Sequence, residues 1–426
     1  MAAETYDGVM TTTFGGILKR LVLLAGGASL TILLVACSAG TEATSSTSGG
    51  GIPQGPIIIG MPIGLTGFIS SYDGNVLKGA QVAADQINAA GGVNGHAIEI
   101  ITSDTTSDMA KGGPAAEDVI AKGAQFILPS VDYNFGGDAA RVAQEHNLIA
   151  ISAADDVRMG HSIGNNIFNL DTGGTTAGAA LAQYAVENRK WKNACVLDDT
   201  SLDADIINCK AFEESFTSQG GTIVASSTDR PTGGIDPDAA LIRLASAKDS
   251  FDGIMFCGYP PAGVTILKQI REAGVNQDIL LTDAFDGNFW QEPLKESDAL
   301  KNIYIISYAP ITPGESGDGD AAASLKLAAD RGLGVTVSLS YLDGYSAVQA
   351  IAEAVASTKS VKADDIRPYL EAFVDHRLAI GPTTWTPTCH VRVGSPMFIA
   401  STAGGMEKFE TIITATHLPA DPCGKP

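Results

Sequence analysis

The sequence is poor in the residue patterns that carry catalysis or hold metals. It contains no Walker A loop and no H-E-x-x-H zinc motif. Its six histidines are scattered without ligand-like spacing, and none of its six cysteines forms a C-x-x-C pair. We therefore expect no metal site, no cofactor and no enzymatic activity.

Positive charge is also scarce. The chain carries 27 Lys and Arg against 48 Asp and Glu, which gives a formal net charge of −21. Nucleic-acid binding depends on clustered cations, so we expect no nucleic-acid partner. Broad contact with anionic lipid headgroups is disfavoured for the same reason. A small cationic or hydroxyl-rich solute remains compatible with this composition.

One long apolar run occurs, at residues 21–35, and it is shorter than the ~20 residues that span a bilayer. Lys19 and Arg20 precede it and Cys37 follows it closely. This layout is typical of a secretory signal. A cysteine at this place resembles the lipobox of bacterial lipoproteins, which implies a signal peptide at residues 1–36, a lipid on Cys37 and an extracytoplasmic location. An uncleaved membrane anchor is the alternative.

The next segment, residues 37–55, is rich in Ser, Thr and Gly, so we expect a flexible tether behind the lipid anchor. Either Met1 or Met10 could begin the signal. The body from residue 56 onward is long enough for two domains.

The body alternates short apolar runs with segments of helical spacing. Such alternation predicts an α/β fold with parallel sheets covered on both faces. The first series has expected strands at 57–61, 98–102, 126–128 and 148–151, with helices at 76–88, 113–122 and 137–146. The second has expected strands at 194–197, 222–225, 253–257 and 279–282, with helices at 176–187, 205–218, 238–247 and 263–273. We expect the strand Ile303–Ser307 and the helix 341–356 to return to the first sheet.

An ordered set of motifs spans nearly the whole body and resembles the branched-chain amino-acid-binding (Leu/Ile/Val-binding) family of type I periplasmic substrate-binding proteins of ABC importers. The matching pieces are Leu65-Thr66-Gly67, Lys78-Gly79-Ala80, residues 87–95, residues 267–274, and Ile380-Gly381-Pro382 with Thr384-Trp385. The resemblance implies a monomer that binds a small solute and delivers it to an ABC permease.

The resemblance also implies two Rossmann-like lobes that are joined by three crossover strands and close on the solute by hinge motion. We expect the crossings near residues 170–173, 300–302 and 393–397. The N-terminal lobe would comprise residues 56–172 and 302–393, and the C-terminal lobe residues 173–301 and 394–426.

Site residues carried over from the resemblance point to an unusual ligand. Tyr72 and Tyr259 fall at aromatic pocket walls, and Asp283 falls where the family binds the ligand ammonium. Tyr133 and Asp156 stand where the family holds the ligand carboxylate with Ser and Thr. A desolvated carboxylate repels another, so this departure argues against an ordinary α-amino acid.

A further aromatic position of the family is occupied by a different residue near Asp203. Asn134 could donate a hydrogen bond to the ligand instead of the Ser and Thr of the family. The carboxylates expected near the cleft suit a cationic, amide or hydroxyl-rich solute, and they are Asp132, Asp155, Asp156, Asp203, Asp283 and Asp286. Helix capping is the alternative role for some of them.

An extracytoplasmic location permits disulfides. The pairs that we expect are Cys195–Cys209 and Cys389–Cys423, with Cys257 as a buried free thiol, although sequence alone does not fix connectivity. Two other functions remain open: a ligand sensor of the same fold for a membrane signalling protein, and a secreted hydrolase that uses cleft carboxylates such as Asp283 or Asp156.

Overall fold

A computed structural model gives the fold of the body. The structure describes residues 51–227, 242, 244–287, 289–295, 298–309, 319–333, 339–402 and 408–423. The predicted signal, the lipidation at Cys37, most of the tether and half of the helix predicted at 238–247 lie outside these residues. Within the described part, no helix is long and apolar enough to cross a membrane.

The first sheet is five-stranded, parallel throughout, and ordered β2-β1-β3-β4-β5. Its strands are β1 (Ile57–Ile63), β2 (Ile98–Asp104), β3 (Phe126–Ile127), β4 (Ile149–Ser152) and β5 (Ile167–Asn169). The helices between them are α1 (Ser70–Ala89), α2 (Gly112–Ala121), α3 (Tyr133–Glu145) and α4 (Arg158–His161), with the short η1 (Met109–Lys111). The apolar runs predicted as strands are therefore strands, and most are buried on both faces, as parallel sheets require.

The second sheet is seven-stranded and ordered β14-β13-β10-β9-β8-β6-β7. Its strands are β6 (Asn193–Asp198), β7 (Thr222–Ser227), β8 (Gly253–Cys257), β9 (Asp278–Leu281), β10 (Ile303–Ser307), β13 (Met397–Ser401) and β14 (Lys408–Ile413). Its helices are α5 (Gly174–Glu187), α6 (Asp203–Ser218) and α8 (Ala262–Glu272), with η2 (Asp283–Phe285), η3 (Glu292–Leu294) and η4 (Asp298–Leu300). Among the described strands of this sheet, the antiparallel pairs are β10 with β13 and β13 with β14, and the other pairs are parallel.

The predicted return of Ile303–Ser307 to the first sheet is wrong. This strand is β10, and it pairs parallel with β9 on one side and antiparallel with β13 on the other, with Tyr304 opposite Leu280 and Ser401. A fully buried strand needs partners on both sides, but an unbroken apolar run does not say which sheet provides them. The chain therefore leaves the second sheet after β10 and not near residues 300–302.

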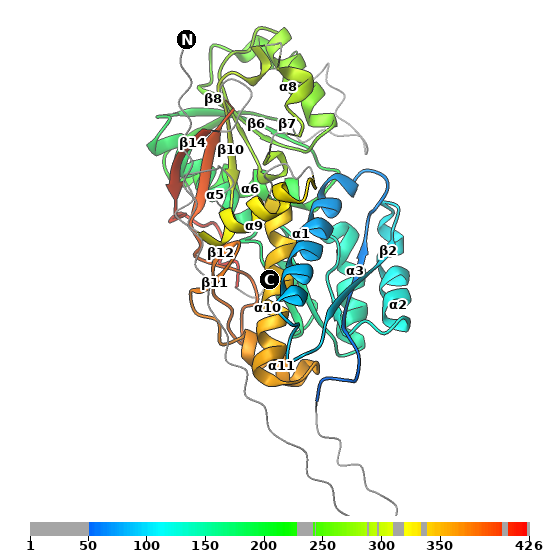
Figure 1. Ribbon diagram of the computed structural model, residues 1–426. Coiled ribbons are helices and arrows are strands. Elements are labelled where there is room, and N and C mark those ends of the chain that lie inside the picture. Colours follow the sequence, from blue (N-terminus) through cyan, green and yellow to red (C-terminus); the bar gives the residue numbers. More distant parts are fainter. Residues whose placement is uncertain are drawn as a thin grey trace, which may run out of the picture. The chain divides into compact units, whose positions relative to one another are not determined.

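The predicted long helix is α10 (Leu339–Thr358), and it lies along α1 (Figure 1). Glycines permit this close approach. A methyl group on Gly79 would lie 1.9 Å from the carbonyl oxygen of Tyr341, and one on Gly344 would lie 1.9 Å from that of Val76. The neighbouring described elements are α9 (Gly319–Asp330), α11 (Ala363–Leu370), β11 (His376–Leu378) and β12 (Gly381–Thr383).

The disulfides agree only in part with the expectation. Cys389 is joined to Cys423, as predicted. Cys209 is joined to Cys257, with their Cα atoms 5.8 Å apart, and Cys195 is the buried free thiol, so the Cys195–Cys209 pair and the free Cys257 were wrong. Side chains alternate along a strand. In β6, Cys195 packs with Leu197 in the core on one face, whereas Cys209 and Cys257 pack in the core on the other.

Candidate functional site

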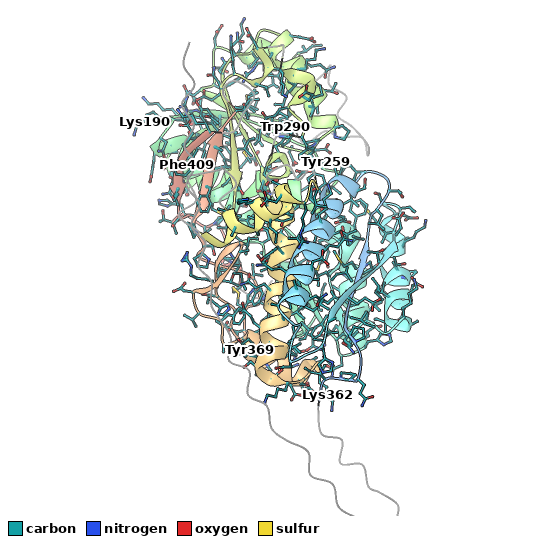
Figure 2. All side chains as sticks on the ribbon, viewed as in Figure 1. Lys190, Tyr259, Trp290, Lys362, Tyr369 and Phe409 are labelled. Atoms are coloured by element: carbon teal, nitrogen blue, oxygen red, sulfur yellow. A yellow bond between two sulfur atoms is a disulfide. The ribbon has the colours of Figure 1, made fainter. Side chains whose placement is uncertain are left out.

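A cavity of about 80 Å³ lies at the carboxyl ends of strands from both sheets. Ligands of open α/β sheets bind at this edge, beyond the carboxyl ends of the strands. Tyr259, which lines the cavity, lies beside the start of α1 (Figure 2). The lining consists mainly of carboxylates, aromatic rings and small apolar side chains: Phe68, Ile69, Tyr72, Val131, Asp132, Ala153, Asp155, Asp171, Leu202, Ala204, Asp205, Tyr259, Asp283, Ala284, Tyr308, Leu339, Ser340 and Asp343.

Three lining carboxylates follow strands of the first sheet. Asp132 follows β3 and caps α3, where its side chain accepts a hydrogen bond from the Asn134 amide at 2.8 Å. Asp155 follows β4, and its Oδ2 accepts a hydrogen bond from Asn208 Nδ2 at 3.1 Å. Asp171 follows β5 and accepts a hydrogen bond from the Gly173 amide at 2.6 Å. These hydrogen bonds thus fix one oxygen of each carboxylate and leave the second oxygen available to the cavity.

The other three lining carboxylates come from later parts of the chain. Asp205 lies in the first turn of α6, which follows β6, and Asp283 opens η2 directly after β9. Asp343 lies in the first turns of α10 and accepts a hydrogen bond from the Tyr308 hydroxyl at 3.1 Å. Asp205, Asp283 and Asp343 are 3%, 6% and 2% exposed, so little solvent screens their charge.

Asp155, Asp171 and Asp283 form the tightest group. One carboxylate oxygen from each lies within 4.8 Å of the other two. Burial raises the pKa of Asp155, and the neighbouring charges of Asp283 and Asp171 raise it further. Burial also raises the pKa of Asp283 and of Asp171. The group therefore holds protons more tightly than ordinary aspartates and would release them to a bound cation.

The pKa values of the other three lining carboxylates are raised as well. Burial raises the pKa of Asp132 to about 7 against hydrogen bonds from the amides of Asn134 and Phe135, which lower it. Burial raises the pKa of Asp205 and of Asp343 well above the ordinary value. The cavity is thus an environment in which negative charge lacks compensation.

No Lys, Arg or His belongs to the described lining. Arg392 contacts the backbone of the lining residue Tyr308 and is 1% exposed. Its guanidinium donates hydrogen bonds to Leu170 O at 3.2 Å, Tyr308 O at 2.6 Å and Ser395 Oγ at 2.9 Å. Its charge lowers the pKa of Asp171 in part, although burial dominates. Arg392 therefore stabilises the backbone around the cavity and leaves most of the carboxylate charge without a cationic partner.

Aromatic rings cover the carboxylates. The Tyr72 hydroxyl donates a hydrogen bond to Ala284 O at 3.0 Å, which joins the start of α1 to the loop after β9. The hydroxyls of Tyr259 and Ser201 are 2.6 Å apart. The ring centroids of Phe68 and Tyr259 are 4.6 Å apart. These contacts connect segments that follow strands of both sheets.

The structure brings five of the predicted ligand-binding residues into the cavity wall, namely Tyr72, Asp132, Asp155, Tyr259 and Asp283. The other five do not line it, namely Tyr133, Asn134, Asp156, Asp203 and Asp286.

Arg158 explains why four of those residues lie elsewhere. Its Nε donates to Asp156 Oδ2 at 2.6 Å, and its guanidinium pairs with Asp203 as well. It also lies 4.3 Å from the centroid of the Tyr133 ring. Asn134 Oδ1 in turn accepts a hydrogen bond from the Asp203 amide at 3.2 Å. The expected clash between Asp156 and a ligand carboxylate therefore has no counterpart in the cavity.

Asp286 has a structural partner instead. Its Oδ2 accepts a hydrogen bond from the Leu339 amide at the start of α10. This contact fixes the helix that carries Asp343. Asp286 thus acts on the cavity through α10 and not as part of its lining.

Sequence reasoning missed Asp171, Asp205, Asp343 and Tyr308. Asp171 directly follows a strand at an expected crossing, so its position was a usable signal. Asp205 lies in the first turn of a helix, where acidic residues are common, so the sequence did not distinguish it from a residue that stabilises the helix. Tyr308 and Asp343 were missed because their segments were assigned to the wrong sheet or to a helix core.

The letters G-x-S-x-G occur at residues 160–164. A nucleophile elbow is a turn from a strand into a helix. Here the order is reversed, because Gly160 lies in α4 and the segment leads into β5. Ser162 is exposed and does not line the cavity. The motif therefore gives no support for the hydrolase alternative.

Residues 56–406 match the family model described as "Periplasmic binding protein". The chain belongs to this family. Membership places the protein outside the cytoplasm. The Leu/Ile/Val-binding protein BraC3 of Rhizobium johnstonii is 25% identical over 340 residues, covering 78% of this chain and 88% of that protein. The named relatives are binding proteins and not enzymes.

Solved structures confirm the predicted fold class. The branched-chain amino acid transporter substrate binding protein LivJ of Streptococcus pneumoniae, solved with isoleucine, is 24% identical with a TM-score of 0.73, and the match covers 84% of this chain and 99% of that one. A solute binding protein of R. palustris, solved with benzoate, is 15% identical with a TM-score of 0.73 and coverage of 86% and 98%. The type 1 periplasmic binding protein of Bordetella pertussis is 17% identical with a TM-score of 0.71 and coverage of 83% and 99%.

Proposed function

We propose that this protein is the solute-binding component of an ABC importer and that it binds a small, positively charged solute in the cavity. One observation carries the proposal: six buried or partly buried aspartates line the cavity, and its described lining holds no cationic side chain. A buried charge requires a partner of opposite sign, and a cationic solute would supply it.

The named relatives leave the solute open. Similar folds are described with isoleucine and with benzoate, which differ in charge and shape. An α-amino acid would bring its carboxylate into a wall of carboxylates and pay a desolvation penalty without a cationic partner. An amine without a carboxylate avoids this repulsion.

We further propose hinge closure between two lobes. The lobes would comprise residues 56–172 with 308–393, and residues 173–307 with 394–426, since β10 belongs to the second sheet. The Tyr72–Ala284 hydrogen bond and the Arg158–Asp203 ion pair join segments of both lobes beside the cavity. A solute that touches carboxylates of both lobes would favour the closed state by its differential affinity.

A thermal-shift screen of the full chain tests the proposal. Separate panels would contain amines, neutral amides and sugars, α-amino acids, and carboxylates. Ligand at about 100 times Kd adds about 2.7 kcal/mol to the free energy of unfolding, so amines should raise the melting temperature by several degrees. Recovery of the solute unchanged after incubation, measured by mass spectrometry, distinguishes binding from hydrolysis. Stabilisation by leucine-like amino acids alone would contradict a cationic solute.

We also propose that Cys37 carries a lipid that holds the protein on the outer side of the membrane. The support is the sequence pattern at residues 19–37. The variant Cys37→Ala should move the protein from the membrane fraction into the soluble fraction, while the buried Cys195→Ala control should not. A membrane-bound Cys37→Ala protein would indicate an uncleaved anchor instead.

A further inference from the structure

The lining carboxylates fall into two groups around two tyrosines. Burial raises the pKa of Tyr308, and the charges that add to this effect are those of Asp343, Asp171, Asp283 and Asp155. Burial also raises the pKa of Tyr259, and there the lining charges that add to it are those of Asp205 and Asp132. Contacts support this division. The Tyr308 hydroxyl donates to Asp343 at 3.1 Å, whereas the Asp203 amide donates to Asn134 Oδ1 at 3.2 Å and so joins the helix starts that carry Asp205 and Asp132.

The group near Tyr308 has the geometry of a primary ammonium site. An ammonium has three donor hydrogens. Asp155, Asp171 and Asp283 present one oxygen each within 4.8 Å of the others, and acceptors about 2.8 Å from one nitrogen are spaced in this way. Oδ1 of Asp283 is buried and has no hydrogen-bond partner among the described residues. Asp283 lines the cavity, so a ligand donor can approach its carboxylate there.

The group near Tyr259 can hold a second cation. Oδ2 of Asp205 is also buried without a hydrogen-bond partner in the described part of the chain. Burial raises the pKa of Asp205, and the charges of Asp199, Asp198, Asp132 and, from the other group, Asp283 raise it further. Phe68 and Tyr259 supply aromatic faces at this end, which attract cations.

The remainder of the wall suits a short alkyl chain. Ile69, Val131, Ala153 and Leu202 contribute apolar surface to the cavity. A volume of about 80 Å³ leaves room for roughly five to eight non-hydrogen atoms, because one water needs about 10–15 Å³. This size fits a diamine with a chain of about four or five carbons.

We infer that the solute is a linear primary diamine without a carboxylate, with one ammonium held by Asp155, Asp171 and Asp283 and the other held between Asp132 and Asp205. The inference rests on the proposed function and adds the second charge, the chain length and the assignment of each end. A single divalent cation could occupy the first group, but it would leave Asp205 unmatched and the apolar middle of the cavity empty.

The test is isothermal titration of the full chain at pH 8 with 1,4-diaminobutane, 1,5-diaminopentane, 1-aminobutane, leucine and calcium chloride. The diamines should bind at least about tenfold more tightly than 1-aminobutane, since the second ammonium gains a buried charge partner. Equal affinity for 1-aminobutane and the diamines would contradict the inference of a second ammonium in the solute. It would not contradict the proposal that the solute is cationic. Binding of leucine but of no amine would overturn both.

Two variants distinguish the two proposed ammonium-binding groups of the cavity. Asp283→Asn should weaken the binding of both amines by about tenfold or more, because it removes a carboxylate from the shared ammonium site. Asp205→Asn should weaken the diamines by a similar factor and leave 1-aminobutane within about twofold, so that the preference for a second charge disappears. A diamine preference that survives in Asp205→Asn would overturn the assignment of that end.

Controls keep both results interpretable. Asp138→Asn on α3 replaces a 58% exposed aspartate outside the cavity and should change no affinity. Each site variant relieves repulsion between buried carboxylates, so its ligand-free melting temperature should match or exceed that of the parent. Calcium binding that competes with the diamine, together with diamine affinity no higher than that of 1-aminobutane, would assign the first group to a metal and overturn the proposal.

Discussion

Asp73 holds together two loops that build the cavity wall. It is fully buried, and its carboxylate accepts hydrogen bonds from the Gly64 amide at 2.8 Å, the Ser130 hydroxyl at 3.1 Å and the Val131 amide at 3.2 Å. Burial raises its pKa to about 6 against these hydrogen bonds, which lower it. One side chain in α1 therefore positions the segments that lead to Phe68 and to Asp132.

Replacing this residue should be costly. We expect Asp73→Ala to lower the free energy of unfolding by about 2–4 kcal/mol, because it leaves buried amide donors without acceptors. Urea unfolding of the ligand-free protein measures the change. The matched variant Asp138→Ala, at an exposed position, should lie within about 0.5 kcal/mol of the parent. Equal stability of the two variants would show that the loops hold without Asp73.

The neighbours Asp155 and Asp156 show what sequence can and cannot decide at this scale. Adjacent residues at a strand end point to opposite sides, yet both were expected near the cleft, and only Asp155 lines the cavity. The choice depends on α4, which places Arg158 beside Asp156 at 2.6 Å and leaves Asp155 to the cavity. A partner two residues away in a short helix is a tertiary detail that no strand pattern encodes.

At the scale of elements, the pairing of α1 with α10 depends on glycine at the crossing. We expect Gly79→Ala to destabilise the protein by about 1–3 kcal/mol, because the added methyl would overlap the Tyr341 carbonyl in a packed interface. Gly74→Ala on the same helix meets nothing within 4 Å and should stabilise by about 0.5–1 kcal/mol. Thermal unfolding of the two variants should therefore shift in opposite directions. A shift in the same direction would mean that α10 can move away.

Most elements were predictable from periodicity, because buried parallel strands read as apolar runs and helices show one apolar face. The pairing of these elements in the folded protein was less predictable. The run Ile303–Ser307 has the composition of any central strand, and its place in the second sheet comes from pairing with β9 and β13. The pairing of Cys209 on α6 with Cys257 on β8 depends on which face of the second sheet α6 covers, and that is also a property of the assembled sheet.

At the scale of the whole molecule, buried carboxylates make stability depend on pH. The pKa of Asp132 is about 7 in the folded protein against an ordinary value of 3.8, so the folded state binds more protons than the unfolded state between these values. Stability from such a group is complete below pH 3.8 and is lost as the pH rises through the folded pKa. Asp155, Asp205, Asp283 and Asp343 shift in the same direction.

We therefore expect the melting temperature of the ligand-free protein to fall between about pH 4 and pH 7, where folded Asp132 still holds the proton that the unfolded chain has lost. Within this window His390 acts in the opposite sense, because burial lowers its pKa. Differential scanning calorimetry measures the fall, and Asp132→Asn should reduce it, since asparagine still caps α3 but does not titrate. A melting temperature that is constant or rises across the window would contradict the burial of uncompensated carboxylates.

Arg158 also bears on kinetics. Its guanidinium ties Asp156, after β4, to Asp203, at the start of α6, and the Tyr72 hydroxyl spans a similar gap to Ala284. Under the proposed hinge closure, a captured solute departs when such bridges separate, so they govern the dissociation rate more than the association rate. Loosening them through Arg158→Lys or Tyr72→Phe should hasten dissociation and hardly alter the association rate. Turnover by a transporter downstream would then be limited by how quickly these bridges open.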